Sequence, residues 1–122
     1  MTTQQRATPP NWPGTGAEWI VYGTLLWLGK RPDRDFIYGG RQSENAITFS
    51  FTSPPDLGIN VVGMMQTYST GVDRSSVDQL TRQQALGTGV RLIFIDDVDL
   101  EQDPSYYVEE ALKYRDHSQM GG

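Results

Sequence analysis

The 122-residue sequence contains no cysteine and a single histidine, His117. The absence of cysteine excludes a disulfide framework, a thiolate metal site and a cysteine nucleophile. One histidine cannot build a metal site that needs several imidazoles. The chain also has no long apolar run, because its most apolar stretch, residues 19–28, covers ten residues where about 20 are needed to span a bilayer. With a polar start that does not have the form of a signal peptide, we expect a soluble, non-secreted protein with no membrane partner.

Basic residues are also scarce, with 10 Lys plus Arg against 15 Asp plus Glu and a formal net charge of -5. This balance argues against broad electrostatic capture of nucleic acid. The charge is unevenly spread, since residues 1–44 carry five bases and four acids while residues 45–122 carry five and eleven. Two such molecules could meet basic face to acidic face, in a head-to-tail contact. Four bases are candidates for phosphate contacts, or else ordinary solvated loop charges: Lys30, Arg31, Arg34 and Arg41.

A length near 120 residues predicts one domain with its own core. Residues 1–14 contain three prolines and a single large apolar side chain, and we interpret them as an extended arm. Residues 15–117 form the predicted domain, and residues 118–122 a C-terminal tail. The domain opens with a helix, because Thr15 and Glu18 have the spacing of a capping box and Gly29 provides the stop.

This first helix is apolar at eight of the ten positions from 19 to 28, around most of its circumference. We therefore expect it to be covered on more than one side, by the domain or by a neighbouring chain. The aromatic side chains that could serve such an interface are Trp12, Trp19, Tyr22 and Trp27.

Strand patterns follow at residues 36–38, 46–51, 59–65 and 90–95. The last of these is apolar on both faces, which predicts a place in the middle of a sheet. A second helix is expected over residues 73–86, and a third begins at Asp103 and Pro104, a favourable N-cap followed by proline at the first helical position. The order α-β-β-β-α-β-α predicts a small α/β domain with a single mixed sheet.

Seven acids and no base occur between Asp96 and Glu110. Their alternation at first suggests a calcium loop, but Gln102 and Val108 stand where that loop needs glycine and a bidentate glutamate. Two interpretations remain open, a solvated acidic edge with acids at a helix N-terminus and a docking surface for a basic partner. His117 has no serine or cysteine partner at a defined spacing, and we expect it to be exposed.

Several short segments carry a family resemblance over residues 17–117. They are Glu18-Trp19-Ile20-Val21-Tyr22, Gly39-Gly40-Arg41, Phe51, Gly58-Ile59-Asn60-Val61-Val62-Gly63, Tyr68, Arg91-Leu92-Ile93-Phe94-Ile95-Asp96 and Asp103-Pro104-Ser105-Tyr106-Tyr107-Val108. Together they resemble small restriction-endonuclease-like proteins of the PD-(D/E)xK type, related to the very-short-patch-repair nucleases. Similar short proteins occur in tailed-phage genomes. The resemblance implies a restriction-endonuclease-like core with the element order given above.

The resemblance also implies where catalytic groups would stand. Such nucleases carry an aspartate before the aromatic residue of one strand, acids on the next strand and often a histidine after it. In this sequence these positions hold Ser50, Asn60, Val62 and Thr67. Because Mg²⁺ in nucleases is held by carboxylates, the motif is degenerate, and no catalytic residue, metal ligand or cofactor is expected.

The resulting prediction is a non-catalytic structural or assembly protein of a tailed-phage particle, located in the virion or the host cytoplasm. Its expected partners are other protein chains, copies of itself included, and nucleic acid is possible but not favoured. One alternative is a Mg²⁺-dependent nuclease, which needs two acids at a shared ion from among Glu18, Asp35, Asp56 and Asp96. Another is a regulatory domain that binds nucleic acid through the four bases named above. Glu18 is explained without catalysis as a helix cap, and Asp56 as a turn former.

Overall fold

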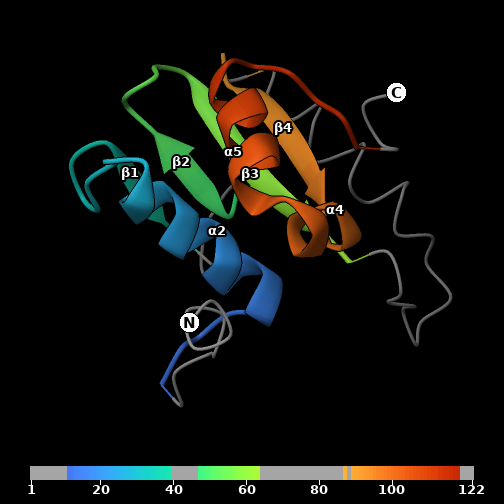
Figure 1. The fold of residues 1–122 in the computed structure, drawn as a ribbon. Helices are drawn as coiled ribbons and strands as arrows, with labels where there is room; N and C mark the ends of the chain where they lie inside the picture. Colours follow the sequence, from blue (N-terminus) through green and yellow to red (C-terminus); the bar gives the residue numbers. More distant parts are fainter. Residues whose placement is uncertain (1–10, 40–46, 64–86, 88, 119–122) are drawn as a thin grey trace, which may run out of the picture.

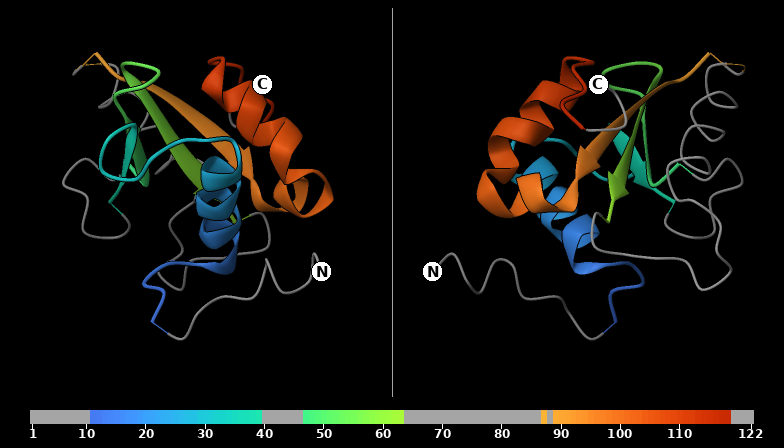
Figure 2. Two further views of the ribbon diagram at one scale, coloured as in Figure 1. Left: turned by 60° about the vertical axis from the view of Figure 1, so that its left-hand side comes forward. Right: turned by 90° about the vertical axis from the view of Figure 1, so that its right-hand side faces the viewer.

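The computed structural model describes residues 11–39, 47–63, 87 and 89–118. Within these ranges a four-stranded sheet carries helices on one face (Figures 1 and 2). The elements in chain order are α2 (Gly16–Trp27), β1 (Phe36–Tyr38), β2 (Phe49–Phe51), β3 (Leu57–Val62), β4 (Arg91–Asp96), α4 (Asp97–Gln102) and α5 (Pro104–Leu112). The expected mixed α/β class is confirmed. The helix expected over residues 73–86 lies outside the described residues, as does most of the predicted arm and tail.

The sheet has the order β1-β2-β3-β4. Its first three strands are antiparallel neighbours, and β4 lies parallel to β3. The register joins Phe36 to Phe51, Phe51 to Leu57, and Leu57 to Arg91, so these four residues mark one end of the sheet. The strands are in the predicted places with shifted ends, since β2 begins at Phe49 and β3 covers Leu57–Val62.

The prediction that the strand over residues 90–95 lies in the middle of the sheet is wrong for the sheet described here, where β4 forms an edge. Its two apolar faces have a different cause. Ile93 and Ile95 pack under the helices, while Leu92 and Phe94 join a second cluster on the opposite face. The strand is therefore buried above and below, without a neighbouring strand on both sides.

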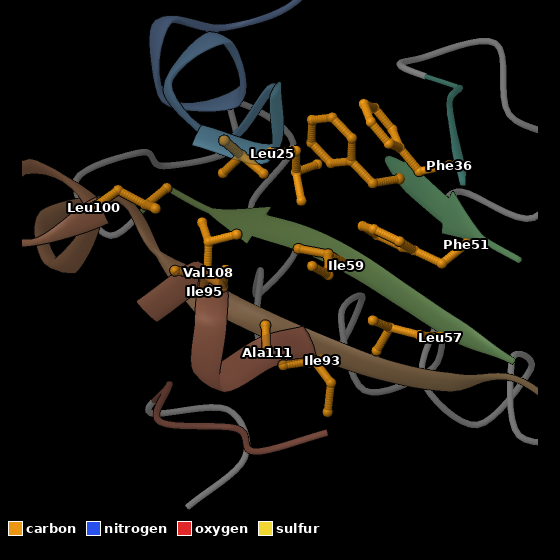
Figure 3. Packing of buried hydrophobic residues seen from close by; sticks show 12 residues of the cluster. Leu25, Phe36, Phe51, Leu57, Ile59, Ile93, Ile95, Leu100, Val108 and Ala111 are labelled. Carbon is orange, nitrogen blue, oxygen red and sulfur yellow. The ribbon is translucent and has the colours of Figure 1, made fainter. Parts of the chain in front are cut away.

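The main core lies between the sheet and the helices (Figure 3). Val21 and Leu25 of α2 are fully buried, and Leu100 of α4 and Val108 of α5 reach the same cluster. Each such side chain contributes about 1.5–3 kcal/mol on burial. Ala111 of α5 also belongs to this cluster, and the strands supply its remaining members, Phe36, Phe49, Phe51, Leu57, Ile59, Ile93 and Ile95.

The two longer helices begin where the sequence places them. Thr15 caps α2, where its Oγ1 accepts from the Glu18 N–H at 3.1 Å and Glu18 Oε1 accepts from the Thr15 N–H at 3.3 Å. Gly29 follows the end of α2 with a φ of 89°, a conformation that glycine adopts without strain. Asp103 caps α5, with Pro104 as its first residue.

Candidate functional site

The positions where the resemblance places catalytic groups fall on one face of the sheet. Ser50, Asn60 and Val62 alternate with residues of the main core, so their side chains lie on the face away from the helices. Ser50 pairs with Gly58, and Val62 pairs with Asp96. The fold therefore brings three of the four predicted positions to the same surface of the sheet. The fourth, Thr67, lies outside the described residues.

Two of these three side chains serve the fold, and the third is exposed. Asn60 Oδ1 accepts a hydrogen bond from the Thr48 N–H at 2.6 Å, which ties the segment entering β2 to β3. Val62 is buried in the second apolar cluster with Ile47. Ser50 is exposed and contributes a neutral hydroxyl. None of the three can supply the anionic oxygen that Mg²⁺ coordination in a nuclease requires.

Two of the acids considered for a nuclease site are held in local structure by hydrogen bonds. Glu18 completes the α2 cap, and its Oε1 also accepts a hydrogen bond from the Tyr38 hydroxyl at 2.7 Å. Asp35 Oδ2 accepts from the Arg31 backbone N–H at 2.8 Å and from Arg31 Nε at 3.3 Å. These bonds from Arg31 hold the pKa of the Asp35 carboxyl below its ordinary value of 3.8.

The other two acids lie at opposite ends of the β3–β4 pair. Asp56 adopts a left-handed conformation, with a φ of 57°, in the turn that leads into β3, and its carbonyl oxygen accepts from the Arg91 N–H. Asp96 ends β4 and is 4% exposed. Asp56 is therefore beside the first residue of β4, and Asp96 is the last residue of the same strand. At roughly 3.3 Å per residue, the length of β4 separates the two acids by about 17 Å. Over the ranges that the structure describes, no three acidic or histidine side chains are grouped to hold a metal ion.

Three of the four predicted basic residues lie on the connection between α2 and β1. Lys30 is half-buried, whereas Arg31 and Arg34 are exposed. Arg31 forms an ion pair with Asp35 at 3.3 Å, which uses part of its charge within the chain. Arg41, the fourth candidate, lies outside the described residues. Figure 1 places this connection at the far end of the molecule from α4.

Three of the four predicted interface aromatics pack on one another. The Trp12 ring lies 4.9 Å from Trp19 and 5.4 Å from Tyr22, centroid to centroid, and 4.6 Å from Tyr38. This aromatic cluster covers the first turns of α2 from within the same chain. The Trp19 indole N–H is buried and has no hydrogen-bond partner among the described residues. Trp27 differs from the others, with 75% of its surface exposed.

The acidic stretch after β4 forms a short helix that the sequence analysis missed. α4 covers Asp97–Gln102, and six residues are too few to show a helical repeat. Asp103 Oδ1 accepts from the Tyr106 N–H at 3.2 Å, as expected for an N-cap. The nearby carboxylates, Asp99 first, raise the pKa of the Tyr107 phenol. Acids thus gather at the α4 end of the molecule.

A cluster around Glu110 was also missed. The Glu110 side chain is 10% exposed, and its carboxylate contacts His117 at 2.9 Å and Arg115 at 3.3 Å. The hydrogen bond to His117, with the charges of Arg115 and Lys113, holds the pKa of Glu110 below its ordinary value. His117 is exposed, as expected, but its ring is bonded to the Glu110 carboxylate. Seven residues separate it from Glu110, and no sequence pattern predicts that contact.

No family model, curated protein or solved structure matches this chain. In the described part of the chain, none of the helices has both the length and the apolar character that a membrane span requires.

Proposed function

We propose that this chain is a non-catalytic structural or assembly protein, a component of a tailed-phage particle built on an inactivated restriction-endonuclease-like fold. It acts in the virion or the host cytoplasm and joins other protein chains, copies of itself included. The phage attribution and the nuclease-like topology come from the sequence resemblance. The described meander of three strands followed by a parallel strand is compatible with that topology.

The observation that carries the non-catalytic assignment is the role of Asn60. At the strand position where the resemblance calls for an acid, its amide oxygen binds the Thr48 backbone N–H at 2.6 Å. Two residues further on, Val62 is packed among apolar side chains. In a nuclease, carboxylates hold the divalent ion, and the ion stabilises charge at the scissile phosphate. Neither of these two positions supplies a carboxylate to hold such an ion. This surface of the sheet therefore supports a structural role.

The distribution of charge supports assembly with a second copy. Arg31 and Arg34 are exposed at one end of the molecule, beside the end of α2, where Trp27 is exposed. α4 and the start of α5 present acids at the other end, including exposed Glu101 and Asp103. Opposite charges at opposite ends favour a head-to-tail contact, and an exposed tryptophan supplies apolar area for its centre. The proposed contact therefore joins the α2 end of one copy to the α4 end of the next.

Native mass spectrometry and sedimentation velocity test the assembly role. We expect association that grows with protein concentration and weakens when about 0.5 M salt screens the charged ends. Trp27→Ser should abolish it, while Ile37→Ser, which removes a side chain 54% exposed on β1, should leave it intact. A wild-type protein that remains monomeric at all accessible concentrations would contradict self-assembly.

A plasmid-nicking assay with Mg²⁺ and Mn²⁺ tests the non-catalytic assignment separately. We expect no cleavage by the wild-type protein with either ion. Metal-dependent nicking that disappears in Asp96→Asn would establish the nuclease alternative. Salt-dependent DNA binding without cleavage, lost when Arg31 and Arg34 are replaced by Ala, would instead establish the nucleic-acid-binding alternative.

A further inference from the structure

Four of the five exposed large apolar side chains of the described residues form two pairs. Leu26 and Trp27, 44% and 75% exposed, lie at the end of α2. Val98 and Tyr106, 44% and 46% exposed, lie on α4 and on the first turn of α5. The end of α2 and α4 are on opposite sides of the molecule (Figure 1). Neither pair can therefore cover the other within one chain.

The end of α2 combines an open apolar surface with positive charge. A Cβ atom on Gly23 would meet nothing within 4 Å, so the helix backbone is bare one turn before Trp27. Residues three or four apart share a helix face, which places Leu26 and Trp27 beside this bare stretch. The connection that follows α2 exposes Arg34. The surface called the basic end below comprises Gly23, Leu26, Trp27 and Arg34.

Val98 and Tyr106 both point away from the core of their own chain. Each stands two residues before a fully buried residue of its helix, Leu100 in α4 and Val108 in α5. Two residues correspond to about 200° around a helix, so the exposed and buried side chains lie on opposite faces. The two exposed side chains are therefore placed to contact another molecule.

The charge next to Tyr106 is negative. Asp103 and Glu109, three residues to either side of it, are both exposed. The His117 ring lies 5.7 Å from the Tyr106 ring, centroid to centroid, but its Nε2 contacts the Glu110 carboxylate at 2.9 Å, which offsets any positive charge on the imidazole. The surface called the acidic end below comprises Val98, Asp103, Tyr106 and Glu109.

We propose that Trp27 at the basic end of one copy docks on Tyr106 at the acidic end of the next. This contact rests on the proposed function and identifies the residues at the centre of its head-to-tail interface. Each end offers two exposed apolar side chains with charge of one sign, and the signs are opposite. Tryptophan and tyrosine are the residues that most often dominate binding energy at an interface, and their rings pack favourably on one another.

The charges favour contact between unlike ends over contact between like ends. A two-fold contact of the basic end with itself would bring together Arg34 of both copies, and a two-fold contact of the acidic end would do the same for Glu109. Because the two partners stand at different ends, one copy uses both at once. The same contact then repeats along a chain of copies or closes into a ring.

Two variants that each block one end test this contact by complementation. Trp27→Ser blocks the basic end and Tyr106→Ser the acidic end, and both change exposed side chains outside the core. Alone, each variant should associate at least about tenfold more weakly than the wild type. An equimolar mixture should form a complex with one copy of each and nothing larger, because the acidic end of Trp27→Ser and the basic end of Tyr106→Ser are both intact.

Sedimentation velocity and native mass spectrometry measure these species, and Tyr106→Phe, which keeps the ring, should associate like the wild type. If Tyr106→Ser also associates like the wild type, the docking of Trp27 on Tyr106 is overturned while self-assembly stands. A mixture of the two blocked variants that stays monomeric, or that grows beyond one copy of each, overturns it as well. A monomeric wild type would instead contradict the proposed self-assembly, and this contact with it.

Discussion

At the scale of single residues, Glu18 shows how a carboxylate in this chain serves the fold. Its Oε1 accepts from the Thr15 N–H at the α2 cap and from the Tyr38 hydroxyl on β1. The cap could be predicted from sequence because its partners are three residues apart. The bond to Tyr38 could not, since twenty residues separate the two and only the folded sheet brings them together.

Tyr38→Phe tests the worth of that contact. The substitution keeps the ring in the aromatic cluster and removes only the hydroxyl that donates to Glu18 at 2.7 Å. We expect the free energy of unfolding to fall by about 1–2 kcal/mol, as for a hydrogen bond to a charged acceptor. Urea unfolding measures it, with exposed Tyr106→Phe as the control. Equal stability of the two variants would show that the Glu18 contact contributes little.

Glu110 predicts a specific dependence of stability on pH. Its folded-state pKa is lowered, so the ionised carboxylate stabilises the protein above its ordinary value of 4.5 and ceases to do so as the pH falls through the lowered value. Urea midpoints from pH 7 to about 3 should show wild type above Glu110→Gln at neutral pH, with the gap closing in acid. Glu109→Gln should show no such gap. A gap that stays constant to the acid end would contradict the lowered pKa.

At the scale of elements, β2, β3 and β4 approach closely at Gly58. A Cβ atom there would lie 2.9 Å from Ile47 Cγ2 and 3.1 Å from Leu92 Cδ1, both buried side chains. The glycine therefore lets the second apolar cluster pack directly on the strand backbone. In α2, by contrast, a Cβ on Gly23 would meet nothing within 4 Å.

Replacing these two glycines by alanine should have opposite effects. Gly58→Ala is expected to destabilise the protein by about 1–3 kcal/mol through overpacking. Gly23→Ala should stabilise it by about 0.5–1 kcal/mol, because alanine favours the helix and the site is open. Urea unfolding of both variants checks the two signs. A Gly58→Ala protein as stable as the wild type would contradict the close packing at β3.

The helices predicted most accurately from the sequence are those that begin at a recognisable capping residue. Caps at Thr15 and Asp103 located α2 and α5, and the bounds of β1 match residues 36–38. α4 was missed because its acids look like a solvated edge and its single buried position, Leu100, gives no repeat. The edge position of β4 was missed because burial on both faces does not reveal how many neighbours a strand has.

At the scale of the whole molecule, the candidate site was predictable in part. The resemblance selected Ser50, Asn60 and Val62, and the register places them on one face of the sheet. The Asn60 bond to Thr48 could not be foreseen, because it depends on how the chain enters β2. Likewise, Trp12 was expected to serve a partner chain, whereas its ring packs on α2 and β1 of its own chain.

NMR titration of the wild-type protein with Mn²⁺, whose unpaired electrons broaden the signals of nearby amides, tests the non-catalytic assignment most directly. An ion seated where a nuclease would hold it would lie beside Asn60, Val62 and Asp96, on the face away from the helices. We expect these amides to broaden no more than those of residues elsewhere on the molecular surface. Selective broadening at the three positions, abolished in Asp96→Asn, would show that the sheet holds a divalent ion and would contradict the non-catalytic assignment.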